Sequence, residues 1–93
     1  MTDYEFDEAK SLNNLRERGF DFDFAARIFE NPVIEFEDNR RDYGEVRFVA
    51  IGCVNDVCLT IVYTWREHHR RIISARRASR KERDVYDQAV REG

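Results

Sequence analysis

Three consecutive strand patterns separated by short turns constrain the fold of this chain more than any other feature. Residues 46–54 alternate between two faces, residues 57–64 are rich in β-branched side chains, and residues 71–78 form a third strand pattern. Because strands joined by such short connections pair antiparallel, the sequence predicts a meander. Gly52 is predicted to form a bulge or twist point in the first of these strands.

Two helices are predicted before this meander. Asp7 is a predicted N-cap and Gly19 the predicted end of the first helix. Its predicted apolar face consists of Ala9, Leu12 and Leu15. A second, shorter helix has to end before the chain's single proline, because the residue before a proline is pushed out of the helical region. Extended segments at residues 4–6 and 33–36 precede and follow the two helices.

A third helix is predicted at the C-terminus. Residues 79–82 have the sequence S-R-K-E, a capping box in which a hydroxyl and a carboxylate satisfy each other's backbone amides. The predicted buried face of this helix consists of Val85, Tyr86, Ala89 and Val90. The chain is therefore predicted to be one α+β domain over residues 1–93, in the order β-α-α-β-β-β-β-α. Its antiparallel sheet of about four strands would have two N-terminal helices and one C-terminal helix on one side.

Charge is distributed unevenly along the chain. The first 45 residues carry 13 acidic and 6 basic side chains, whereas residues 65–83 carry eight basic and two acidic ones. The net charge of −3 conceals this asymmetry. A basic segment on an otherwise acidic body indicates a surface that binds a polyanion, and RNA phosphate is the predicted ligand.

The third strand of the meander has the densest arginine pattern, R-R-I-I-S-A-R-R-A. Strict alternation predicts one face with Arg71, Ile73, Ala75 and Arg77 and another with Arg70, Ile72, Ser74 and Arg76. A guanidinium held on a strand is preorganised for bidentate contact with phosphate, so Arg76 and Arg77 are candidate ligands, with Arg47 and Tyr63 projecting nearby. The alternative is structural: Arg76 or Arg77 could pair with Glu45, Glu82 or Asp84.

The cysteines and the terminal segments bear on cellular location. Cys53 and Cys58 flank a hairpin turn and could lie opposite each other. Without an export signal they favour free thiols in a reducing cytoplasm over a disulfide. A zinc site that adds His68 and His69 is a weaker alternative, because adjacent histidines on extended chain diverge. The acidic N-terminus and the lack of a long apolar run predict neither a signal peptide nor a membrane span.

Several segments in order resemble the BrnT-type toxins of bacterial type II toxin–antitoxin systems, which are relatives of the RelE fold. They are Y-E-F-D-E-A-K-S-L-N-N-L-R-E-R-G-F at 4–20, A-A-R-I-F-E-N-P at 25–32, G-E-V-R-F at 44–48, V-Y-T at 62–64, R-I-I-S-A-R-R-A at 71–78 and E-R-D-V-Y at 82–86. The most specific of them is the 71–78 block followed by the E-x-x-x-Y helix.

This resemblance implies a ribonuclease that inhibits growth by cutting RNA and is neutralised by a BrnA-type antitoxin. The predicted mechanism, internal attack of the 2′-hydroxyl, needs no metal ion or other cofactor. It also implies that the complex represses its own operon, with the antitoxin contacting operator DNA. The matching motif positions are Lys10, Arg47, Tyr63, Arg76, Arg77, Glu82 and Tyr86. Arginine is predicted to neutralise phosphate charge at positions 47, 76 and 77. Lys10, Tyr63 or Tyr86 is the predicted proton shuttle.

The chain departs from the family pattern at two places. Members usually have F-x-W-D where this chain has Y-E-F-D at 4–7, and K-H-G where it has Glu17-Arg18-Gly19. The histidine of that pattern is the obvious general acid or base. Two alternatives to a ribonuclease therefore stay open: a weak or inactive member that acts as an antitoxin-binding and operon-regulating module, and a domain whose arginines serve internal bridges only.

Overall fold

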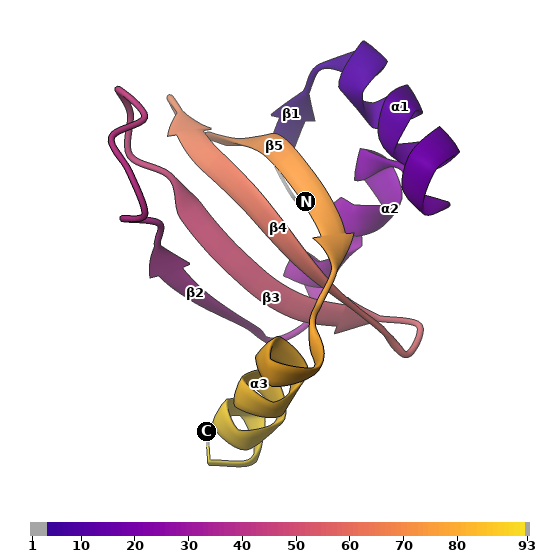
Figure 1. Cartoon of the computed structure of the whole chain (residues 1–93), viewed down its shortest axis with the longest axis vertical. Coiled ribbons are helices and arrows are strands. Elements are labelled where there is room, and N and C mark those ends of the chain that lie inside the picture. The colour runs from indigo at the N-terminus through magenta and orange to yellow at the C-terminus, as the bar shows by residue number, and fades with distance from the viewer. Residues whose placement is uncertain (1–3, 93) are drawn as a thin grey trace.

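A five-stranded mixed sheet in the order β1-β5-β4-β3-β2 forms the centre of the computed structural model, which describes residues 4–92 (Figure 1). The strands are β1 (Tyr4–Phe6), β2 (Val33–Glu37), β3 (Phe48–Val54), β4 (Val57–Arg66) and β5 (His69–Arg77). The helices are α1 (Glu8–Arg18), α2 (Phe22–Ala26), the 3-10 helix η1 (Arg27–Glu30) and α3 (Arg80–Glu92). The predicted α+β class and order of elements are confirmed. None of the helices in residues 4–92 has the length and apolar composition that a membrane crossing requires.

One edge of the sheet differs from the predicted antiparallel arrangement. Strands β2 to β5 form the expected meander, but β1 pairs parallel to β5, with Tyr4 opposite Arg70 and Phe6 opposite Ile72. This pairing joins segments more than sixty residues apart, so it cannot be predicted from a local sequence pattern. Since β1 reaches only to Ile72, residues 73–77 of β5 have no strand neighbour on that side within the described part of the chain.

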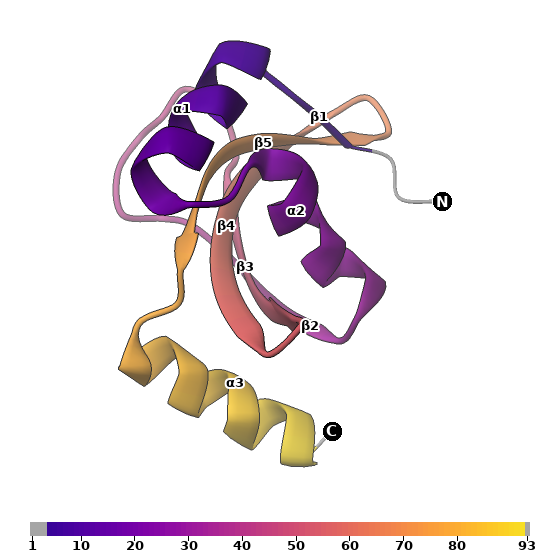
Figure 2. The same cartoon turned by 90° about the vertical axis from the view of Figure 1, so that its right-hand side faces the viewer.

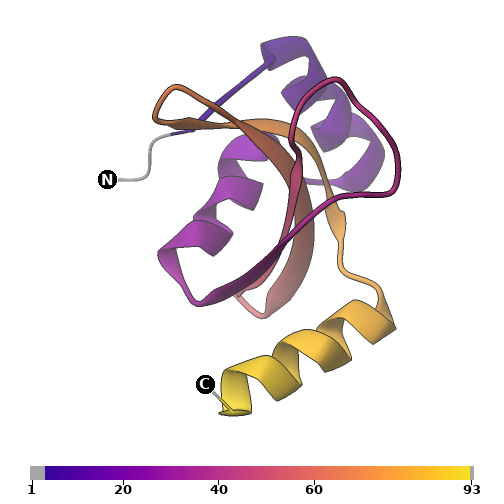
Figure 3. The ribbon, with the colours of Figure 1, turned by 90° about the vertical axis from the view of Figure 1, so that its left-hand side faces the viewer.

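The helices cover both faces of the sheet, so the predicted placement on one side is wrong. Apolar residues of α2 and η1, among them Phe22 and Ile28, pack on the face that carries Leu59 and Ile61. Helix α3 packs on the opposite face through Tyr86, which belongs to a second buried cluster centred on β3. The predicted buried face of α3 is wrong for Val85 and Val90, which are about half exposed. Figures 2 and 3 show α3 well separated from α1 and α2.

The predicted ends of α1 are confirmed, but the apolar face of this helix does not pack into the core. Asp7 accepts a hydrogen bond from the backbone of Lys10, and Gly19 adopts the left-handed conformation with φ 87° that favours glycine. Leu12 and Leu15 are nevertheless 52% and 45% exposed. Two polar residues of the same helix, Ser11 and Asn14, are buried in their place.

Gly52 does not form the predicted bulge. It pairs in regular register with Val33 on β2 and Leu59 on β4. A Cβ at this position would lie 2.8 Å from Val33 Cγ1 and 3.0 Å from Ile28 Cβ. The missing side chain therefore allows η1 to approach β3 closely.

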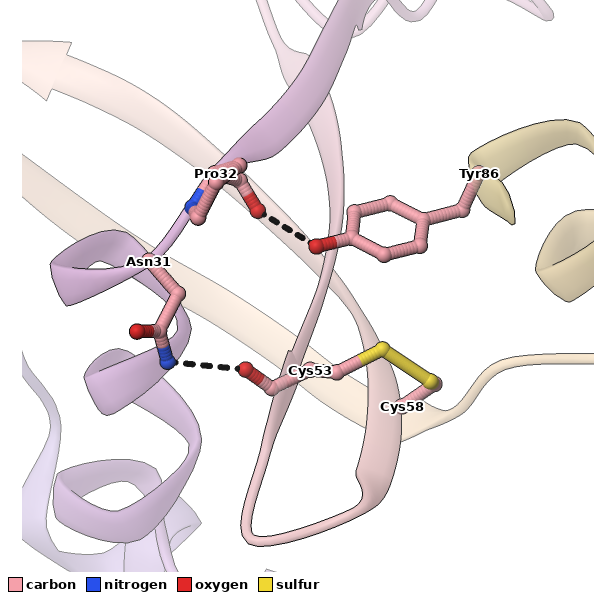
Figure 4. Close-up of a disulfide and its surroundings, with 5 residues drawn as sticks. All are labelled: Asn31, Pro32, Cys53, Cys58 and Tyr86. Atoms are coloured by element: carbon pink, nitrogen blue, oxygen red, sulfur yellow. Dashed lines mark hydrogen bonds between the residues drawn. A yellow bond between two sulfur atoms is a disulfide. The ribbon is translucent and has the colours of Figure 1, made fainter. Parts of the chain in front are cut away.

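Cys53 and Cys58 form a disulfide, so the expectation of free thiols is wrong (Figure 4). They lie directly opposite each other on β3 and β4, as their spacing around the turn predicted, with Cα atoms 4.0 Å apart. Sulfur atoms bonded to each other cannot serve as zinc thiolates, which removes the alternative metal site. The Cys53 carbonyl also accepts a hydrogen bond from Asn31 Nδ2 (3.0 Å), which ties the hairpin to the end of η1.

Candidate nucleic-acid interface

A bulge in β5 decides which arginines share a face. The β4–β5 pairing skips Ile73, an extra residue on β5 opposite the step from Val62 to Tyr63. Ile72 and Ala75 are consequently both buried in the core below α2. The predicted strict alternation is therefore wrong: Arg70 and Ile72 lie on the side of Ala75 and not with Ser74 and Arg76.

Three arginines line one hollow of about 330 Å³ at the uncovered half of β5. Arg76 extends from the face of α3, Arg77 from the opposite face, and Arg18 from the last turn of α1. Within residues 4–92, Arg18 and Arg77 form no ion pair, so their guanidinium groups are available to an external anion. We call this site the arginine hollow. Three guanidinium groups around one cavity suit the bidentate binding of phosphate oxygens.

Arg76 is held in place by Glu82. Its two terminal nitrogens donate to the two carboxylate oxygens of Glu82, at 2.7 and 2.9 Å. Glu82 also accepts from Thr60 Oγ1 on β4 (3.1 Å) and from the backbone N–H of Ser79 (2.8 Å). The backbone N–H of Glu82 donates in turn to the Ser79 hydroxyl, which confirms the predicted capping box. One carboxylate thus joins β4, β5 and the start of α3, and it fixes the orientation of Arg76.

Replacing Glu82 with glutamine is expected to flatten the loss of stability in acid. The hydrogen bonds from Arg76, followed by that from Ser79, lower the pKa of Glu82 from 4.5 to about 2. A carboxyl whose pKa falls on folding stabilises the protein above pH 4.5, and this contribution disappears as the pH falls toward 2. The Arg76 side chain is 42% exposed, so solvent screening reduces the effect to about 2 kcal/mol.

The measurement is urea unfolding of both proteins at about pH 6 and about pH 3. The wild-type protein should lose more free energy of unfolding than Glu82→Gln between these conditions. Asp38 contributes its own acid dependence to both proteins and cancels in the comparison. Equal losses would show that the Arg76–Glu82 pair does not stabilise the fold.

A second hollow of about 310 Å³ lies on the α3 face, and Arg76 lines it together with Arg40. Arg40 donates from Nε and Nη2 to the buried carboxylate of Asp38, both at 2.8 Å. These bonds, a third from the backbone N–H of Arg40 and a fourth from the Tyr43 hydroxyl hold the pKa of Asp38 well below its usual range. In the charged loop of residues 38–47 between β2 and β3, Asp38 is buried, and its ion pair positions Arg40 beside the second hollow.

Tyr63 lies in a separate cluster on the opposite face. Its hydroxyl donates to Glu35 Oε1 at 2.5 Å, and burial together with this bond raises the pKa of Tyr63 to about 12. The Arg70 guanidinium lies 3.8 Å from Glu35 and stacks over the rings of Phe29 and Trp65, at 4.1 and 4.8 Å from their centroids. Glu35 and Arg70 were not predicted as site residues, because their proximity depends on the bulge and on η1.

The remaining predicted site residues lie apart from the arginine hollow. Arg47 donates to Glu45 (3.1 Å) and stacks on Tyr43, about four strand positions or roughly 13 Å along β3 from the level of Arg76. Lys10 is exposed on α1, about 12 Å along the helix axis from Arg18. The Tyr86 hydroxyl donates to the Pro32 carbonyl at 2.7 Å (Figure 4). Of the six residues predicted to be catalytic, the structure brings together only Arg76 and Arg77.

Two of the arginines that line these hollows were not among the predicted site residues. Arg18 stands where the family pattern has a histidine, and Arg40 lies in the loop between β2 and β3. The sequence does contain a signal that could have identified Arg18. It directly precedes the glycine that ends α1, so its position at the turn back toward the sheet was predictable. No comparable signal marked Arg40.

Residues 6–82 match a family model described as "Ribonuclease toxin, BrnT, of type II toxin-antitoxin system". The match extends from the end of β1 to the first turn of α3 and includes Arg18, Arg76, Arg77 and Glu82. No protein among those with curated functions matches the sequence significantly.

Proposed function

Since the chain belongs to the BrnT family of ribonuclease toxins of type II toxin–antitoxin systems, we propose that it binds and cuts RNA at the arginine hollow. The observation that carries this proposal is the meeting of Arg18, Arg76 and Arg77 around one cavity at the uncovered edge of β5. Arg40 extends the basic surface across Arg76 to the second hollow. An RNA backbone that crosses the edge of β5 would place successive phosphates beside both.

The proposed reaction needs no metal ion. The 2′-oxygen of one nucleotide attacks the adjacent phosphorus, and the bond from phosphorus to the 5′-oxygen breaks. The 2′-hydroxyl proton passes to a base, and the 5′-oxygen receives a proton as it leaves. The products are a 2′,3′-cyclic phosphate and a 5′-hydroxyl. Guanidinium groups stabilise the negative charge that develops on the phosphate oxygens, which is usually the largest single contribution to catalysis.

Within this proposal, Arg76 and Arg77 neutralise phosphate charge. Lys10 and Tyr63, the predicted proton shuttles, both lie outside the hollow, and the buried Tyr63 hydroxyl donates to Glu35. We therefore assign neither of them to proton transfer at the hollow, because a general acid or base has to lie within hydrogen-bond reach of the reacting oxygen. Arg47 retains a supporting contact with the backbone of a longer RNA. The Tyr86 hydroxyl already donates to a backbone carbonyl, so we assign Tyr86 to the attachment of α3.

The proposal also covers the type of antitoxin, the contact with operator DNA and the cellular compartment. A type II system pairs its toxin with a protein antitoxin, and we propose that this antitoxin is of the BrnA type. Operator DNA would be contacted through the antitoxin in the complex. Because the RNA substrate lies in the cytoplasm, we place the protein there, where the Cys53–Cys58 pair would meet reducing conditions.

A second candidate function is that of an antitoxin-binding module with little cleavage activity. The observation that favours it is Arg18, which lines the hollow where the family pattern has a histidine. A cavity with three guanidinium groups binds phosphate well, but arginine is permanently protonated and cannot serve as a general base. The two candidates share the same partner and differ only in turnover.

The deciding experiment incubates the purified protein with a single-stranded RNA in the presence of EDTA. A ribonuclease of the proposed type yields 2′,3′-cyclic phosphate ends and leaves the matched 2′-deoxy oligonucleotide intact. Intact RNA, together with tight antitoxin binding, would support the module instead. In that case Arg18→His should restore cleavage if the histidine is the missing group.

A further inference from the structure

Helix α1 presents an apolar surface to solvent. Leu12 and Leu15 are one turn apart on the same helix face, and both are about half exposed. Leu15 lines a pocket of about 280 Å³ together with Phe24 of α2 and Val57 of the β3–β4 hairpin. We call the surface formed by Leu12, Leu15, Phe24 and Val57 the α1 groove.

The outward orientation of these leucines follows from hydrogen bonds that α1 makes on its other face. Ser11 Oγ accepts from the backbone N–H of Phe22 at 3.0 Å, and Asn14 Nδ2 donates to the carbonyl of Phe20 at 2.9 Å. Both bonds are buried and satisfy the backbone of the α1–α2 connection. Turning the leucines inward would leave these groups without partners, so the α1 groove is a fixed feature of the fold.

Arg77 connects the α1 groove to the arginine hollow. It lines the 280 Å³ pocket beside Leu15 and also the hollow that it shares with Arg18 and Arg76. Within residues 4–92 it has no carboxylate partner in an ion pair. Asp21 also lines this pocket, with its carboxylate engaged as the N-cap of α2 by the backbone N–H of Phe24. An occupant of the groove therefore meets an apolar surface, the free Arg77 guanidinium and a carboxylate that already has a hydrogen-bond partner.

We propose that the α1 groove anchors the antitoxin, which inserts an apolar side chain beside Leu15, places a carboxylate on Arg77 and so covers the arginine hollow. RNA lacks the large aliphatic side chain that such a groove accommodates. In a dimer whose two-fold axis passes through the groove, the Arg77 side chains of the two copies would lie close together, which is unfavourable. An acidic, amphipathic segment of a protein partner fits both features, and type II systems supply a protein antitoxin.

Only one part of this assignment rests on the proposed function, namely that the bound antitoxin blocks RNA cleavage. Its test therefore measures binding separately. The double variant Leu12→Gln/Leu15→Gln removes the apolar groups without adding charge beside Arg77. The matched control is Val85→Gln/Val90→Gln on α3, because these valines are 50% and 44% exposed, close to the 52% and 45% of the two leucines.

The probe is the purified protein encoded by the reading frame next to that of this chain, titrated by calorimetry. We expect the α1 variant to bind it about a hundredfold more weakly and the α3 variant to bind it as the wild-type protein does. In cells, the α1 variant should stay toxic when the antitoxin is co-expressed. If RNA cleavage is absent from the wild-type protein, the proposed function fails while the calorimetric comparison still decides the docking site.

Two results would overturn the docking assignment. Unchanged affinity of the α1 variant, or loss of affinity in the α3 variant alone, would place the antitoxin elsewhere. Sedimentation of the isolated protein tests the other occupant. A wild-type dimer that the α1 variant dissociates would show that a second copy covers the groove.

Discussion

Arg77→Ala is expected to lower kcat/KM for RNA cleavage by about a hundredfold, because one well-placed donor to a developing oxyanion is typically worth this much. Arg77 lines the arginine hollow and forms no ion pair within residues 4–92, so its charge is free to act on phosphate. Arg76 shares its guanidinium with Glu82 and should contribute less on its own. Steady-state cleavage of a short fluorescent RNA measures the effect.

Two further variants separate position from charge. Arg66→Ala removes the same charge from an exposed site at the far end of β4 and should cleave at close to the wild-type rate. Arg77→Lys keeps the charge but loses the planar fork, so we expect an intermediate rate. If Arg77→Ala and Arg66→Ala cleave equally well, the arginine hollow is not the place of reaction.

Tyr86→Ala is expected to destabilise the protein by about 3 kcal/mol, which lowers Tm by roughly 15 °C for a domain of this size. Tyr86 is the buried residue of α3, and its ring packs against Val49 and Ile51. Its hydroxyl reaches across to the carbonyl of Pro32 (Figure 4). Removing the ring therefore eliminates the main attachment of the helix and leaves a cavity.

Thermal unfolding followed by circular dichroism measures this loss. Val85→Ala, at the neighbouring half-exposed position, is the matched control and should change Tm little. Tyr86→Phe removes only the hydroxyl and should cost about 1 kcal/mol while cleavage is retained. Loss of cleavage without loss of stability in Tyr86→Phe would instead restore this tyrosine as the proton shuttle that the motif predicted.

Predictions from local patterns agree with the structure where short-range hydrogen bonds determine the outcome. The N-cap at Asp7, the left-handed Gly19 and the Ser79–Glu82 capping box were all expected from spacing and residue type. The meander followed from strand patterns and short turns. Each of these features involves atoms a few residues apart, so the sequence contains the information without reference to the rest of the chain.

The candidate site was predicted only in part. The sequence pointed to Arg76 and Arg77, but it placed them with Arg47 and a tyrosine and not with Arg18. Arg18 and Arg76 are 58 positions apart and meet only because α1 ends beside the uncovered half of β5. Because the pairing with β4 skips Ile73, Arg70 lies on the other face of the sheet from the one that strict alternation predicts. Such a shift in register cannot be recognised from the sequence of β5 alone.

By itself, the sequence determined the elements of this protein, their order, their caps and the family to which they belong. Only the tertiary structure decided that β1 joins β5, that Cys53 bonds to Cys58, and that α1 buries Ser11 and Asn14 while exposing its leucines. The physical reason is the range of the interactions. Helix ends and tight turns depend on hydrogen bonds between residues a few positions apart. The buried face of a helix, the pairing at a sheet edge and the lining of a cavity depend on which distant backbone groups need hydrogen-bond partners once the segments pack together.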